Sequence, residues 1–212
     1  MIVRDVHSAN LMNVSTLSGF TMPDAIPPLE VIAILNKQGV RFTLVGAYGI
    51  GGWIKKSRAT EDVEVIVAAQ DHKKALAALL AEFPHLQAED HEVVTHLRDS
   101  ETQQVAIDLM KPNDPLFREA LKQTYWVENG GQRYQIPSLE MALTMKFASM
   151  ISLNRAEADR YIDAHDFIHM VQANAEIDLE TLASLGEIVY TGGGQAVVGY
   201  VQDVRAGRKI NI

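Results

Sequence analysis

The sequence predicts an α/β (α+β) fold in which a mixed sheet flanked by helices is followed by a C-terminal helical region. Two observations predict it. Up to residue 136, short runs rich in Val and Ile alternate with segments whose apolar residues recur every three or four positions. Beyond Pro137 only the helical period remains. We therefore expect a core over residues 1–136, with an N-terminal arm over residues 1–26, and a helical region over residues 137–212.

The elements of the core follow from apolar periodicity and from the residues that interrupt it. Helical periodicity begins after Pro27-Pro28 and stops at Gly39, while Asn129-Gly130-Gly131 predicts the turn of a hairpin. The expected helices cover residues 29–39, 71–83 and 115–122, with a short one ending at Trp53. The expected strands cover residues 40–45, 62–67, 93–97, 104–110, 125–127 and 133–136, the third and fourth joined by a turn at 98–101.

The C-terminal region predicts helices over residues 139–151 and 161–171 and a weaker one over 180–190. The glycines at 192–194 are expected to punctuate the last stretch.

Composition and charge narrow the class of protein. The 212 residues include no cysteine, which excludes disulfides, zinc fingers and thiol catalysis. No apolar run is long enough to span a bilayer and the N-terminus lacks the apolar core of a secretory signal, so we expect a cytoplasmic protein without a membrane partner. The net charge of −8 argues against a surface that binds nucleic acid throughout. Local basic clusters occur at Lys55, Lys56 and Arg58 and at Arg205, Arg208 and Lys209, the second of which we interpret as solvated surface charge.

Three carboxylates stand out because they interrupt otherwise apolar strands. Asp62 and Glu64 are two residues apart on one expected strand, so their side chains project from the same face with bases roughly 7 Å apart. Asp108 stands between Ile107 and Leu109 on another strand. Because magnesium prefers carboxylate oxygens together with substrate phosphates, the three residues predict a two-metal site for a nucleotide complex. For any one of them, a side chain that simply faces water is the alternative.

The junction after strand 40–45 predicts a place for an anion. Gly46-Ala47 leads from this strand into a helix, whose first N–H groups have no partner inside the helix. A glycine also lets a phosphate approach the backbone closely. Such junctions are common, so the feature alone does not define a nucleotide site.

The segment Val45-Gly46-Ala47, followed by Arg58-Ala59-Thr60-Glu61-Asp62-Val63-Glu64-Val65, resembles the signature of the nucleotidyltransferase superfamily of DNA polymerase beta type. Ile107-Asp108-Leu109 is similar to the strand that carries the third carboxylate of that superfamily. The Arg-x-Thr-x-Asp lead-in is similar to the AbiEii/MenT-type branch, whose better-known members are toxins of toxin–antitoxin pairs. Two residues depart from the pattern, since Ala47 replaces a Gly or Ser and Glu64 replaces the commoner Asp.

The resemblance implies a nucleotidyltransferase core and roles for individual residues. Asp62, Glu64 and Asp108 would hold two Mg²⁺ ions, or Mn²⁺, and act in catalysis. The residues implied to bind the nucleotide are Gly46, Ala47, Arg58, Thr60 and Lys146, the last on its phosphates. Asp163 would support Lys146 or the acceptor. The family's arginine corresponds to Arg155 or Arg160, and Ile162 stands where the family has its second lysine. The residues alone leave open a structural interpretation, with Lys146 at a helix edge and Asp163 facing water.

The resemblance further implies transfer of a nucleoside monophosphate from an NTP to a hydroxyl acceptor on RNA or tRNA, a protein or a small molecule. A toxin of this branch would have an antitoxin protein as its partner. Two alternatives stay open: a catalytically inactive regulator that binds a nucleotide or a partner protein, and an adenylyltransferase that acts on an antibiotic. The acidic net charge is easier to reconcile with a small acceptor than with tRNA.

The histidines give weaker signals. His165 and His169 share a helix face with Asp166, so a zinc site can be drawn there, but such pairs are frequent on soluble helices. His85, His91 and His96 have no spacing typical of metal ligands.

Overall fold

The computed structural model describes residues 26–55 and 60–212, and the chain divides into two compact units. The first unit comprises Met1–Gly52 and Lys56–Pro137, and the second comprises Trp53–Lys55 and Ser138–Ile212. Among the described residues, every strand lies in the first unit. The expected α/β class, with helices alone at the C-terminal end, is confirmed.

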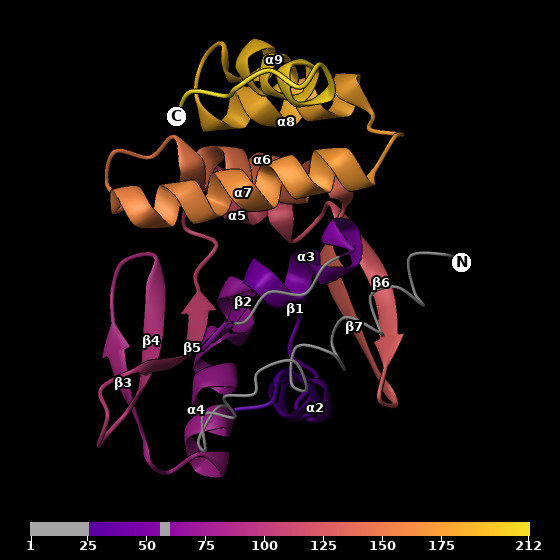
Figure 1. Cartoon of the computed structure of the whole chain (residues 1–212). Coiled ribbons are helices and arrows are strands. Elements are labelled where there is room, and N and C mark those ends of the chain that lie inside the picture. The colour runs from indigo at the N-terminus through magenta and orange to yellow at the C-terminus, as the bar shows by residue number, and fades with distance from the viewer. Residues whose placement is uncertain (1–25, 56–59) are drawn as a thin grey trace. The chain divides into compact units, whose positions relative to one another are not determined.

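The first unit contains both helices and strands (Figure 1). Its elements are α2 (Pro28–Lys37), β1 (Phe42–Leu44), α3 (Gly46–Ile54, whose last residues belong to the second unit), β2 (Val63–Val67), η1 (Ala69–Asp71), α4 (His72–Glu82), β3 (Leu86–Asp90), β4 (Val94–Asp99), β5 (Val105–Met110), α5 (Pro115–Ala120), β6 (Thr124–Asn129) and β7 (Gln132–Pro137).

Five strands form a mixed sheet in the order β1-β2-β5-β4-β3. The central pair β2 and β5 is parallel, and the other pairs are antiparallel. Figure 1 shows β3 and β4 at one side of this unit and the β6–β7 hairpin at the other, where β7 packs beside the edge strand β1. The predicted mixed sheet is therefore confirmed.

The two central strands bury one face. On β2, Val63 and Val65 are 1% and 0% exposed, and on β5 both Ile107 and Leu109 are 0% exposed. These four side chains alternate with the acidic residues, whose side chains leave from the other face. The sheet thus places carboxylates opposite a dry apolar layer, as the period-two pattern predicted.

Strand β3 is absent from the sequence prediction. Only Leu86 of its five residues is buried, and the others are exposed, so the segment has no apolar alternation. Its pairing with β4 comes from backbone hydrogen bonds, from Leu86 opposite Asp99 to Asp90 opposite Thr95. The turn expected at 98–101 is also displaced, because β4 continues to Asp99 and the turn follows it.

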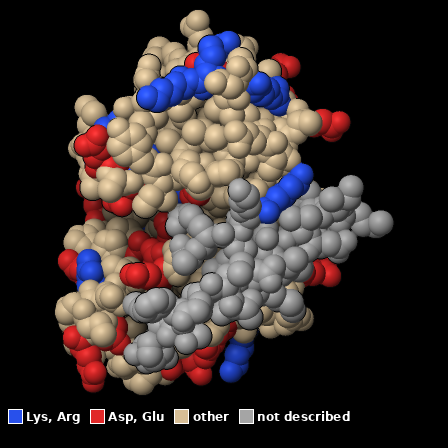
Figure 2. Space-filling model, viewed as in Figure 1, with Lys and Arg blue, Asp and Glu red and all other residues tan. Residues whose placement is uncertain are grey.

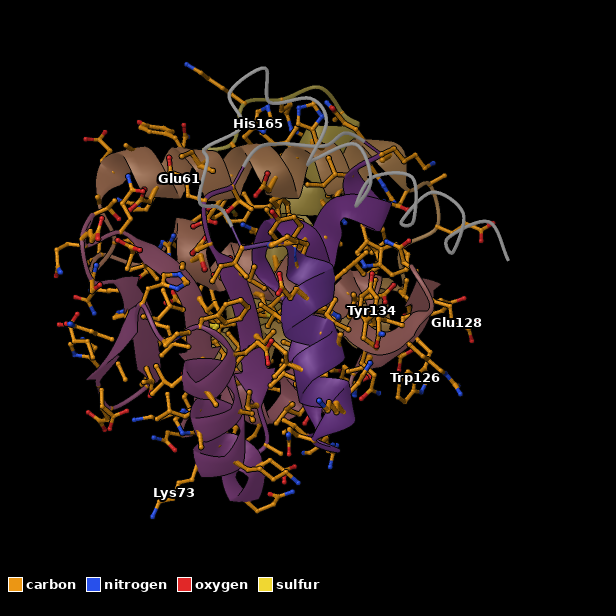
Figure 3. The ribbon with its side chains drawn as sticks, turned by 90° about the horizontal axis from the view of Figure 1, so that it is seen from below. Glu61, Lys73, Trp126, Glu128, Tyr134 and His165 are labelled. Carbon is orange, nitrogen blue, oxygen red and sulfur yellow. The ribbon has the colours of Figure 1, made fainter. Side chains whose placement is uncertain are left out.

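The β6–β7 hairpin confirms the prediction from Asn129-Gly130-Gly131. Gly130 and Gly131 have φ of +54° and +75°, the left-handed values that a two-residue hairpin turn requires. Tyr134 on β7 is buried, whereas Trp126 and Glu128 on β6 lie on the exposed side (Figure 3).

The second unit contains α6 (Leu139–Met150), α7 (Glu157–Ala173), α8 (Leu179–Val189) and α9 (Gly193–Arg205). Helix α9 is absent from the sequence prediction, because the glycines at 192–194 are typical of a break. Its buried residues Val197, Val201 and Val204 nevertheless have helical spacing, and the glycines let its first turn pack closely on α8. In the described part of the chain, no helix has both the length and the apolar character needed to cross a membrane.

Candidate functional site

The three predicted carboxylates, Asp62, Glu64 and Asp108, lie on one face of the first unit's sheet, which we call the acidic face. In the parallel pair, Glu64 on β2 is directly opposite Asp108 on β5. Asp62 precedes β2 by one residue, so it shares the face of Glu64 two positions away. All three side chains are partly buried. The structure therefore brings together residues 44 positions apart in the sequence.

Asp108 is the most constrained of the three. Burial raises the pKa of its carboxyl, a hydrogen bond with His96 lowers it, and the charge of Asp62 raises it again, with a net increase above its usual range. The strand register agrees, because Asp62 directly precedes β2, which pairs with the strand of Asp108. Two like charges kept close together on a partly buried surface favour a cation between or beside them.

Asp62 also interacts with Thr60, which belongs to the same predicted motif, and with Tyr48, which the sequence does not connect with it. The Thr60 hydroxyl donates a hydrogen bond to Asp62 Oδ1 at 2.7 Å. On α3, burial raises the pKa of the Tyr48 phenol, and the charge of Asp62 raises it further. Tyr48 on α3 is therefore affected by the charge of Asp62, although the strand pattern alone gives no signal for it.

Glu64 occupies space at the start of α3. Gly46, the first residue of α3, has φ of +59°, and a Cβ there would overlap the Glu64 carboxylate. The two segments are also joined by a hydrogen bond from Val45 N–H to the Glu64 carbonyl, at 2.9 Å. The Gly46-Ala47 junction, at which we expected a nucleotide phosphate, thus has the Glu64 carboxylate against it.

The predicted residues outside the sheet divide into two groups. Arg58 lies outside the described residues, as does Lys56. Lys146, on α6, and Asp163, on α7, belong to the second unit.

Lys146 and Asp163 lie in a buried network between α6 and α7. Lys146 Nζ lies 2.8 Å from an oxygen of Asp163 and 2.8 Å from an oxygen of Asp166, and Arg155 Nε lies 3.1 Å from the other Asp163 oxygen. The three inner side chains are at most 10% exposed. Burial alone would lower the pKa of Lys146, but the carboxylates of Asp166 and Asp163 outweigh it and raise that pKa.

The described histidines do not form the zinc site drawn from the sequence. His165 and His169 lie with their Nε2 atoms 3.0 Å apart on the exposed side of α7, but Asp166 is buried against Lys146. Throughout residues 26–55 and 60–212, no three His, Asp or Glu side chains are arranged to hold a metal ion.

The carboxylate pair still suits magnesium. Mg²⁺ is usually bound by one or two carboxylates together with substrate phosphates and waters, so a site with an incomplete set of protein ligands is what a metal–nucleotide complex requires. Asp62 and Asp108 provide hard oxygen donors, and the charge of Asp62 contributes to the raised pKa of Asp108. These two residues fit the ion, and Glu64 lies beside them.

A cavity of about 400 Å³ lies elsewhere in the first unit. It is lined by residues 39–42 at the start of β1 and by Trp126, Arg133 and Tyr134 of the hairpin. Phe42 pairs with Val67, at the opposite end of β1 from Gly46, so the cavity is separate from the carboxylates. The Arg133 guanidinium lies 4.5 Å from the Trp126 ring and so is paired within the hairpin.

The basic cluster at the C-terminal end is surface charge, as expected. Figure 2 shows Lys and Arg gathered over the end of the second unit. Arg208 pairs with Asp203 at 2.7 Å, and Arg205 donates to the Ala175 carbonyl at 2.8 Å.

Comparison with known proteins supports the fold. No protein-family model matches the chain, and no curated protein matches it in sequence. An antigenic nucleotidyltransferase-like protein from Paracoccidioides brasiliensis is similar in structure, with 18% identity, a TM-score of 0.50, and coverage of 82% of this chain and 91% of that one. The antibiotic-resistance factor ANT(2'')-Ia is similar with 10% identity, a TM-score of 0.53, and coverage of 85% and 96%. The lincosamide antibiotic adenylyltransferase LnuA, solved with lincomycin, gives 16% identity, a TM-score of 0.49, and coverage of 69% and 95%. The first two likenesses show that the chain has the nucleotidyltransferase fold.

Proposed function

We propose that this chain is a metal-dependent nucleotidyltransferase, which moves a nucleoside monophosphate from an NTP to a hydroxyl acceptor. The observation that carries the proposal is the placement of Asp62, Glu64 and Asp108 on one face of a mixed sheet that has the nucleotidyltransferase fold. In the reaction the acceptor hydroxyl loses its proton to water as its oxygen bonds to the α-phosphorus, the α–β anhydride bond breaks, and pyrophosphate leaves with those electrons.

Each carboxylate has a role in this proposal. Asp62 and Glu64 would hold both divalent cations and Asp108 would hold the catalytic one, and in the structure the Glu64 carboxylate lies against Gly46. Bound Mg²⁺ would supply charge neutralisation on the triphosphate and activation of the attacking hydroxyl. Asp108 also orients the acceptor hydroxyl, and Thr60 holds Asp62 through the 2.7 Å hydrogen bond.

The nucleotide-binding set remains part of the proposal. Gly46 and Ala47 begin α3, whose N-terminal N–H groups favour an anion, and Arg58 precedes the acidic strand in the sequence. Lys146 and Asp163 stay in the proposal as the resemblance implies them, and within the second unit Lys146 pairs with Asp163 and Asp166. Asp163 then acts by holding Lys146.

Two acceptor classes have specific support. A small hydroxylated molecule is favoured by the net charge of −8 and by the structural likeness to an antibiotic-resistance factor. An RNA or protein acceptor, with the chain as the toxin of a toxin–antitoxin pair and an antitoxin as its partner, is favoured by the Arg58-x-Thr60-x-Asp62 pattern alone. We place the small molecule first.

Label transfer tests the function. The purified chain is incubated with Mg²⁺ and each NTP labelled at the α-phosphate, together with hydroxylated antibiotics, total RNA or a cell protein extract in separate reactions. We expect label in one acceptor class and a loss of at least about 100-fold in Asp62→Asn and in Asp108→Asn, in line with the loss of a charged transition-state contact. Undiminished transfer by both variants would refute the assignment. Magnesium-dependent NTP binding without label in any acceptor would instead favour the inactive regulator.

A further inference from the structure

His96 lies in the same row of the sheet as two of the carboxylates. Strands β4, β5 and β2 are neighbours, and their register places His96 opposite Asp108 and Asp108 opposite Glu64. Directly paired residues project from one face of a sheet with Cβ atoms about 5 Å apart. His96 therefore borders the acidic face from the strand next to Asp108.

The contact between His96 and Asp108 is a short hydrogen bond. Its Nδ1 atom lies 2.6 Å from Asp108 Oδ1, and the two side chains are 24% and 18% exposed. Because an ionised carboxylate can only accept, Nδ1 carries the proton and donates it. The bond engages one oxygen of Asp108 and fixes the plane of its carboxylate, so that Oδ2 is the oxygen left to serve a cation.

The ring of His96 is held from the outer edge of the sheet. The ring of His91, directly after β3, packs edge-on against it, with centroids 5.1 Å apart and planes at 65°. His91 Nε2 in turn lies 3.1 Å from Glu89 Oε1 on β3. Strands β3 and β4 thus orient a histidine whose polar contact is with a residue of the acidic face.

We propose that His96 is a positioning residue, which holds Asp108 through Nδ1 in the orientation in which Oδ2 serves the divalent cation. This inference rests on the proposed function, because it takes Asp108 as a ligand of that cation. Hydrogen bonds to ligating groups orient them, and losing one costs about 10–100-fold in metal affinity. Removing the hydrogen bond should therefore weaken metal binding as well as slow turnover.

Binding of Mn²⁺ to the full chain tests this role without relying on turnover. Free Mn²⁺ is measured by electron paramagnetic resonance during titration, with and without ATP. We expect His96→Ala to weaken Mn²⁺ binding by about 10–100-fold. We expect His96→Asn to bind like the wild type, because its Nδ2 atom can donate from nearly the position of Nδ1. His85→Ala, an exposed histidine with no contact to Asp108, is the matched control and should bind normally.

The outcomes separate the two claims. If Asp108→Asn weakens Mn²⁺ binding while His96→Ala does not, the positioning role is wrong and the proposed function stands. Equal losses in His96→Ala and His96→Asn also overturn the role, because the ring and not the hydrogen bond would then matter. If the wild type binds no Mn²⁺ in either condition, the metal site itself is refuted. Thermal unfolding checks each variant, and His96→Leu, which keeps the volume and removes the donor, replaces His96→Ala if that variant does not fold.

Discussion

At the residue scale, both the backbone conformation and the space around position 46 require a glycine. Its φ of +59° belongs to the left-handed region, which is costly for any residue with a Cβ. The space that a Cβ would fill is taken by the Glu64 carboxylate. The glycine and the glutamate therefore fit each other, and a shorter aspartate at position 64 would reach less far toward the start of α3.

Comparing Gly46→Ala with Gly39→Ala separates the cost of the left-handed backbone from the cost of displacing the Glu64 carboxylate. Both glycines have nearly the same φ, +59° and +61°, but a Cβ at Gly39 meets nothing within 4 Å. Each variant should lose about 1–2 kcal/mol of unfolding free energy from the backbone alone. Gly46→Ala should lose about 1–3 kcal/mol more, because Glu64 must move. Urea denaturation measures both, and equal losses would show that the Glu64 contact has no energetic weight.

At the element scale, α6 and α7 are joined by a charge network. Two buried carboxylates, Asp163 and Asp166, are balanced by Lys146 from inside and by Arg155 from the half-exposed side. Such a network contributes little compared with apolar packing, but removing one partner leaves an uncompensated buried charge. The pairing of these two helices should therefore depend on Lys146.

We expect Lys146→Met to destabilise the protein by about 3–5 kcal/mol. The control is Lys122→Met, which removes a 64% exposed lysine paired with Glu119, and this loss should stay below about 1 kcal/mol. Denaturant unfolding followed by circular dichroism compares the two. If Lys146→Met unfolds like the control, its ammonium is not the counter-charge of the buried aspartates.

Helices α8 and α9 pack closely because glycines lie where the two helices meet. A Cβ at Gly193 would meet the Gly186 carbonyl oxygen, whereas a Cβ at Gly199, on the same helix, meets nothing within 4 Å. Gly193→Ala should lose about 1–3 kcal/mol through overpacking. Gly199→Ala should instead gain about 0.4–1 kcal/mol, because alanine lowers the entropy of the unfolded chain. A thermal shift of the same sign in both variants would contradict close packing of these helices.

Local patterns were sufficient to predict some elements but not others. Apolar alternation identified the strands of Glu64 and Asp108, because it reports directly on which side chains are buried. It could not identify β3, whose exposed residues carry no such pattern. His96 was missed for a related reason: its contact with Asp108 depends on the register between two strands, and a turn displaced from 98–101 changes that register. The burial of Lys146 and Asp163 likewise depends on how two helices pack.

At the scale of the whole molecule, the nucleotidyltransferase fold persists at 10–18% sequence identity. This is possible because the fold requires buried apolar positions and backbone pairing, which many sequences provide. The fold alone does not require the carboxylates of the acidic face. Partly buried carboxylates repel each other and are destabilising without a cation or a hydrogen-bond donor. The net charge of −8 adds to that repulsion, so the carboxylates are better explained by a ligand than by stability.

The central claim is that Asp62 and Asp108 hold one cation together with an NTP. Isothermal titration of the four NTPs in Mg²⁺, with the wild type, Asp62→Asn, Asp108→Asn and the double variant, tests it most directly. We predict that each single substitution weakens binding of the preferred NTP and that the double variant loses less than the sum of the two losses, because both residues serve the same ion. Binding of that NTP by the double variant with wild-type affinity would contradict the claim.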